Sequence, residues 1–94
     1  MSESEDPTPQ EAKQINDAAR IEAFITDPVV EQAVLKLERS YFDGFKSSKT
    51  ADERSAFGFK GSVLDDLLLE LKKVVNAGVV AKVTVQRRQR RPSK

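Results

Sequence analysis

The segment from Ala51 to Ala77 constrains the fold more than any other stretch of the sequence. Its apolar residues recur at three- and four-residue steps, which places them on one face of an α-helix. This face spans about 150°, wider than the roughly 100° of an ordinary surface helix, so more than one neighbour is expected. Gly78 follows the last apolar residue and predicts the helix end. The face comprises Ala56, Phe57, Val63, Leu64, Leu67, Leu68, Leu71, Val74 and Val75.

Two shorter helices are predicted before this segment. Thr8 and Glu11 have the spacing of a capping box, and the proline between them suits the first helical position. A first helix is therefore expected from Pro9 to about Ile25. Its apolar side is thin, so it should hold only by docking on another element.

The second helix is predicted to start at Asp27 and Pro28, as cap and first helical residue. It should end near residues 44–47, before a cluster of small polar residues. Thr50 and Glu53 then form a second capping-box pattern, which predicts the start of the third helix. Such a short connection makes consecutive helices antiparallel.

The expected fold is therefore all-α: an antiparallel helical hairpin with an additional N-terminal helix. Residues 1–7 are expected to form a disordered acidic leader, residues 8–78 the helical domain, and residues 79–94 an extended basic tail. Residues 79–86 alternate between apolar and polar positions, as a strand does. A lone strand would leave its backbone groups unpaired. An extended arm is therefore favoured, and strand addition to another chain is the alternative.

The chain contains neither cysteine nor histidine. The commonest general base and the commonest transition-metal ligand are thus missing, so we expect no enzyme, no cofactor and no metal site. The acidic start has no apolar run behind it, and no uninterrupted apolar run, Leu67 to Leu69 included, is longer than three residues. A secretory signal and a membrane span are both unexpected, and a cytoplasmic protein without a membrane partner is predicted.

Charge is distributed unevenly along the chain. Residues 79–94 contain six basic residues and no acidic one, whereas the rest carries ten bases and fifteen acids. The basic end could bind nucleic-acid phosphates nonspecifically. It could also dock on an acidic protein, pair with the acidic start of this chain, or simply be solvated. The candidate phosphate-binding residues are Arg87, Arg88, Arg90, Arg91 and Lys94.

Gly58 and Gly61 enclose a basic residue in the motif GFKG. A loop of this type clamps a nucleic-acid backbone in KH domains, but that fold needs strands around it, and the flanking segments here are predicted to be helical. The favoured interpretations are close approach of a second helix at Gly61, or a helix break at this motif with a new helix start after it.

Apolar residues lie on more faces than one hairpin can cover. We therefore expect Leu35, Phe42, Leu67 and Val74 to be exposed and to bind a protein partner, either a second copy of the chain or another protein.

Segments 27–48, 49–54 and 63–81 together resemble small helical-hairpin proteins of tailed bacteriophages and prophages. The resemblance covers about residues 25–81 and depends on an Asp-Pro helix start, an aromatic end to that helix, an acidic-arginine start to the next helix and a glycine stop. It implies a non-enzymatic helical interaction protein that acts in virion assembly or on a host protein, in the bacterial cytoplasm or in the virion. The alternative is a small protein that binds nucleic acid through its arginine-rich end.

Overall fold

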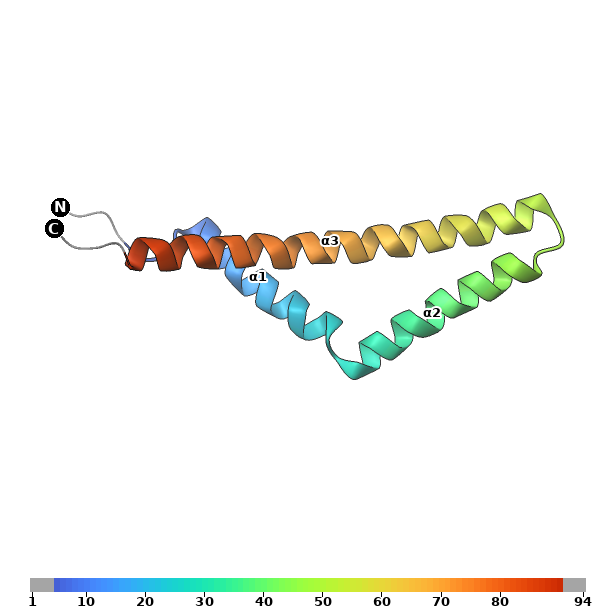
Figure 1. Cartoon of the computed structure of the whole chain (residues 1–94), viewed down its shortest axis with the longest axis horizontal. Coiled ribbons are helices and arrows are strands. Elements are labelled where there is room, and N and C mark those ends of the chain that lie inside the picture. The colour runs from blue at the N-terminus through green and yellow to red at the C-terminus, as the bar shows by residue number, and fades with distance from the viewer. Residues whose placement is uncertain (1–4, 91–94) are drawn as a thin grey trace. The chain divides into compact units, whose positions relative to one another are not determined.

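The computed structural model of the chain describes residues 5–90. It contains three α-helices, α1 (Pro9–Ile25), α2 (Pro28–Ser47) and α3 (Ala51–Gln89) (Figure 1). Residues 5–90 include no strand. The prediction of an all-α protein with three helices is confirmed for this part of the chain.

The starts of α1 and α2 are fixed by side chains that bond to free backbone groups. At α1, the Thr8 amide donates to Glu11 Oε1 at 2.9 Å, and the Glu11 amide donates to Thr8 Oγ1 at 3.1 Å. At α2, Asp27 Oδ1 accepts from the Val29 amide at 2.8 Å. Because the first amides of a helix have no partner within it, these local signals define both starts, as predicted.

The second capping box differs slightly from its prediction. The Glu53 amide donates to Thr50 Oγ1 at 3.1 Å, but Glu53 Oε2 accepts from the Lys49 amide at 3.0 Å, one residue before the expected donor. At the end of α2, the Ser48 hydroxyl donates to the Gly44 carbonyl at 2.6 Å. The connection between α2 and α3 is thus stabilised on both sides.

The predicted end of the third helix at Gly78 is wrong. Helix α3 continues through this glycine to Gln89, so the expected extended arm is helical over residues 79–89 and is not a strand. A glycine ends a helix when it adopts a left-handed conformation, and no glycine in residues 5–90 has a positive φ. The remainder of the predicted tail, residues 91–94, lies outside the described part.

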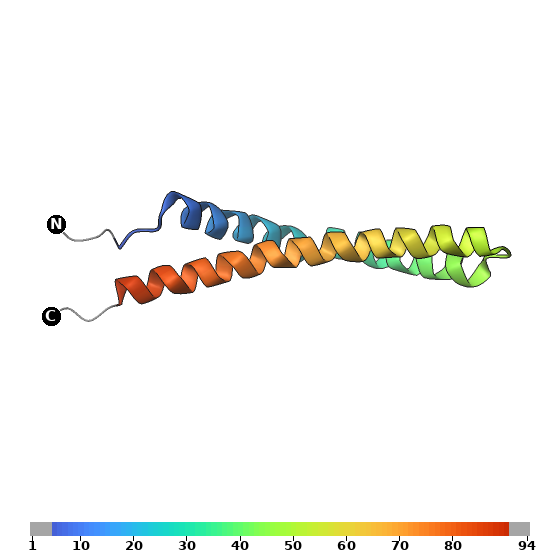
Figure 2. The ribbon, with the colours of Figure 1, turned by 90° about the horizontal axis from the view of Figure 1, so that it is seen from above.

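The chain divides into two packing units. Unit 1 combines α1 through Ala23 with α3 from Leu71 onward, and unit 2 comprises residues 24–70. In unit 1, α1 lies beside the C-terminal part of α3 (Figure 2). Its small core consists of Ala18, Gly78, Ala81 and Val85.

Gly78 explains why α1 packs so closely against α3. A Cβ atom at this position would clash with the Ala18 side chain and would lie 2.7 Å from the Gln14 carbonyl oxygen. The glycine therefore serves as a contact surface for α1, and this packing keeps it helical.

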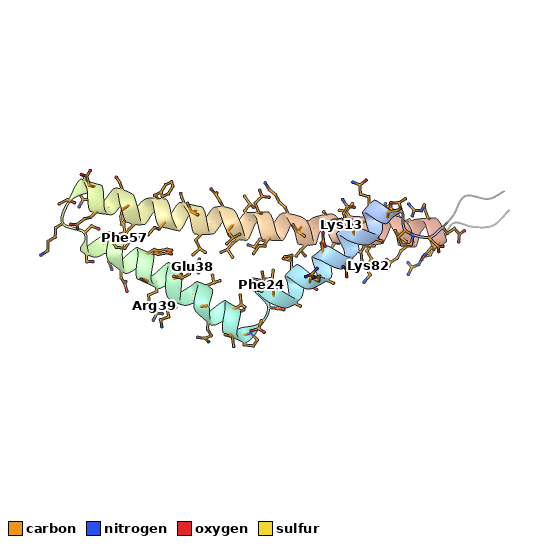
Figure 3. All side chains as sticks on the ribbon, turned by 180° about the vertical axis from the view of Figure 1, so that it is seen from behind. Lys13, Phe24, Glu38, Arg39, Phe57 and Lys82 are labelled. Atoms are coloured by element: carbon orange, nitrogen blue, oxygen red, sulfur yellow. The ribbon has the colours of Figure 1, made fainter. Side chains whose placement is uncertain are left out.

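Unit 2 brings Phe57 of α3 against Gly44 of α2. A Cβ at Gly44 would lie 2.7 Å from Phe57 Cδ1, and Figure 3 shows the Phe57 side chain beside α2. Helix α3 does not break at Gly58 or Gly61. Among the described residues, nothing lies within 4 Å of a Cβ built on Gly61, so the expected close approach of a helix there does not occur within residues 5–90.

The predicted leader, residues 1–7, is described only from residue 5. The carbonyl oxygens of Glu5 and Asp6 accept hydrogen bonds from the Gln89 and Arg88 side chains, at 3.4 and 3.0 Å. This short segment therefore contacts the end of α3.

Candidate functional site

An open groove of about 260 Å³ lies in unit 2, between α2 and the beginning of α3. Its walls are aromatic and its α3 side includes two glycines, so a helix with small apolar side chains could approach closely. Two carboxylates, Glu38 and Asp65, are its only charged lining residues. The full lining is Glu38, Tyr41, Phe42, Phe45, Phe57, Gly58, Gly61, Leu64 and Asp65.

The helices orient the residues of this groove. Glu38 lies on the side of α2 that faces α3, whereas Arg39 points away from it (Figure 3). Lys46 and Lys60 place their ammonium groups 5.2 and 5.1 Å from the ring centres of Phe42 and Phe57, and neither lysine belongs to the lining. The groove is therefore apolar, with two carboxylates in its lining and two ammonium groups over the rings of its walls.

The four predicted partner-binding residues do not form one patch. Phe42 lines the groove, and Leu35 lies seven residues before it on α2. Leu67 follows Gly61 by six positions, which places it about 120° around α3 from the groove. Val74 is half-buried and belongs to unit 1. Leu35, Phe42 and Leu67 are 56%, 55% and 55% exposed.

Exposed apolar side chains are concentrated in unit 2. None of residues 24–70 is buried, although this segment holds ten of the thirteen large exposed hydrophobic residues of the described chain. Unit 2 therefore lacks an internal core, and its apolar surface is available to a partner. The ten are Phe24, Val29, Leu35, Leu37, Phe42, Phe45, Phe59, Val63, Leu67 and Leu69.

The arginines near the end of α3 lie on different sides of this helix. Arg88 points toward α1, where its two terminal nitrogens donate to the Glu11 carboxylate at 2.9 and 2.7 Å. Such a bidentate pair is stronger than a single-contact ion pair. Arg88 therefore ties the end of α3 to the start of α1 through Glu11, which lies in α1 and outside the acidic start that the sequence offered as a partner for the basic end.

This contact changes the acidity of Glu11. Hydrogen bonds from Arg88, and then from the Thr8 amide, lower the pKa of Glu11 from 4.5 to about 2, although partial burial acts in the opposite direction. The carboxylate is ionised at every physiological pH. Its charge is thus used to hold unit 1 together and to cap α1.

Arg87 and Arg90 are exposed. At 100° per residue, they lie with three exposed valines on an arc of about 100°, whose centre is opposite the α1-facing residues Gly78, Ala81 and Val85. Val80 is at the edge of this arc, where it lines an open hollow with Glu11 and Gln14 of α1. The valines are Val79, Val80 and Val83, which are 53%, 65% and 39% exposed. We call the valines with Arg87 and Arg90 the outer face of α3. Arg91 and Lys94 lie outside the described residues.

Residues 5–90 contain no cluster of three or more side chains that could hold a metal ion. Within the same range, no helix has the length and hydrophobicity that a membrane span requires.

Sequence reasoning missed the Arg88–Glu11 pair and the groove. A signal for the pair was present, because Gly78, Ala81, Val85 and Arg88 follow one another at steps of three and four, the spacing of a continuing helix face. The groove had no such signal, since its walls come from two helices.

Comparisons with protein-family models, curated proteins and solved structures find no match to this chain.

Proposed function

We propose that this protein is a non-enzymatic helical interaction protein, which associates with a second copy of itself or with another protein. One observation supports the proposal most directly: residues 24–70 include no buried residue but carry most of the large exposed hydrophobic side chains. A two-helix segment of this kind gains stability when a partner covers it. In this proposal α2 and the first part of α3 act as an antiparallel helical hairpin.

The resemblance to helical-hairpin proteins of tailed phages supports the biological setting that we propose. There the protein would act in virion assembly or on a host protein, in the bacterial cytoplasm or in the virion. Neither role needs a reaction or a cofactor, because each depends on binding alone.

Sedimentation equilibrium of the full chain, from micromolar to near-millimolar concentration, tests the self-associating form of the proposal. The expected result is an average mass that rises with concentration. A constant monomer mass would exclude self-association and leave binding to a foreign protein, which immobilised chain and purified candidate proteins would then examine.

A second candidate function is nonspecific binding of nucleic acid. Arg87 and Arg90 support it, because both are exposed at the end of α3. Fluorescence anisotropy with a labelled duplex and a labelled single strand would test it at two salt concentrations. The double variant Arg87→Ala/Arg90→Ala should weaken binding and reduce the log–log salt slope by about 2. Equal affinity of wild type and variant would exclude this function.

A further inference from the structure

The groove of unit 2 and the outer face of α3 have complementary chemistry. The groove is aromatic and carries two carboxylates, and the outer face presents three valines followed by two arginines. Each surface is open in the monomer. An amphipathic helix that lays its apolar face into the groove is a recurring ligand of an apolar groove.

The segments that contain these two surfaces also differ in net charge. Residues 24–70 carry nine acidic and six basic side chains, whereas residues 71–90 carry six basic side chains and no acidic one. Two copies that bring these segments together gain electrostatic attraction, and two copies that pair like segments do not.

The spacing on the outer face fits a helix-in-groove contact. Val79, Val83 and Arg87 follow one another at four-residue steps, and Val80 lies beside them on the same arc. Gly61 offers open space within 4 Å of its Cβ position, so the backbone of another helix could come near it. The valines would cover the aromatic walls, while Arg87 and Arg90 reach the carboxylates of Glu38 and Asp65.

We propose that the groove between α2 and the beginning of α3 binds the outer face of residues 79–90 of a second copy of this chain. This inference rests on the proposed function in its self-associating form and names the two surfaces that meet. The contact joins two different surfaces, so it closes into a symmetric pair if each copy gives and receives one helix, and otherwise extends from copy to copy.

Nucleic acid would compete for the same arginines, but the observations favour protein. Three exposed valines lie among the residues of the outer face, where a phosphate backbone gains nothing from apolar contact. No aromatic residue lies in residues 79–90 to stack on a base.

Charge reversal in the full chain tests the proposal. The first variant, Glu38→Lys/Asp65→Lys, makes the groove basic, and the second, Arg87→Glu/Arg90→Glu, makes the outer face acidic. Each alone should weaken self-association at least about tenfold, because like charges then meet at the contact. An equimolar mixture should associate again, because each groove then meets an outer face of opposite charge.

A matched control reverses two exposed acids outside the groove, Asp43 and Asp66, to lysine. This variant should self-associate like wild type. Circular dichroism checks that all variants keep their helix content, and the recovery of association in the mixture shows that both charge-reversed chains are folded.

Any one of four results would overturn the inference. A wild-type chain that stays monomeric would remove it together with the self-associating form of the proposed function. Wild-type association that neither reversal weakens, or variants whose mixture does not recover, would remove the groove contact and leave self-association through another surface. Loss of labelled-DNA binding in the Arg87→Glu/Arg90→Glu variant, with unchanged self-association, would assign the outer face to nucleic acid.

Discussion

Gly78 lies so close to Ala18 that a methyl group at position 78 could not be accommodated without moving α1. We therefore expect Gly78→Ala to destabilise the chain by about 1–3 kcal/mol, because the clash outweighs the better helix propensity of alanine. Gly61→Ala is the matched control, since it places the same methyl group in open space on the same helix. It should stabilise by up to about 1 kcal/mol.

Urea unfolding followed by circular dichroism measures both changes. If Gly78→Ala stabilised the protein as much as Gly61→Ala, α1 would not pack on Gly78 in solution.

The Arg88–Glu11 pair should make stability depend on pH in a defined window. The pKa of Glu11 is lowered to about 2 by its hydrogen bonds, so the contribution of its ionised form is fully present above the unfolded pKa of about 4.5. It decreases as the pH falls and is lost below about 2. Glu11→Gln keeps a capping-box side chain but removes the charge.

Thermal unfolding of wild type and Glu11→Gln at a series of pH values tests this. Wild type should melt at the higher temperature near neutral pH, and the two curves should converge near pH 2. A difference that persists at the lowest pH would show that the ion pair is not its cause.

Arg88 and Arg87 are adjacent in sequence but differ in their contacts. Arg88→Met removes the bidentate bonds to Glu11 and leaves that carboxylate without its main partner, so it should lower the melting temperature. Arg87→Met alters an exposed side chain and should change the free energy of unfolding by no more than about 0.5 kcal/mol. Equal losses of stability in the two variants would contradict the conclusion that only Arg88 supports the fold.

Phe57 and Phe59 provide a second matched comparison. Phe57 is half-buried against Gly44, whereas Phe59 is 71% exposed. Phe57→Ala should cost about 1–3 kcal/mol, less than a fully buried phenylalanine, and Phe59→Ala about 0.5 kcal/mol or less. Unfolding at concentrations where the chain is monomeric separates this effect from association. A larger loss of stability for Phe59→Ala than for Phe57→Ala would show that Phe59, and not Phe57, is the packed ring.

The sequence was sufficient to predict the three helix starts, because a start depends on residues that lie next to one another. The bonds that fix these starts join residues close in sequence: Thr8 with Glu11, Asp27 with Val29, and Thr50 with Glu53. The end of α3 depends on a distant segment. Gly78 stays helical because Ala18, sixty residues earlier in the chain, packs on it, and local propensity contains no information about that contact.

The candidate site also depends on contacts between segments that local sequence does not predict. Exposure of Leu35, Phe42 and Leu67 followed from the width of the apolar faces, but the position of Leu67 away from the groove did not. The groove depends on how α2 meets α3, which the helical periodicity of either helix alone does not determine. Val74 was expected to be exposed and is half-buried in unit 1.

The division of the arginine run also affects genetic experiments. Removing residues 87–94 as a block would delete the Glu11 partner together with the exposed arginines, so a lost phenotype could reflect a poorly folded chain or a lost binding partner. Single substitutions on the two sides of the helix separate these causes. A mutation at Arg88 therefore reports on folding, whereas a mutation at the neighbouring Arg87 reports on contact with other molecules.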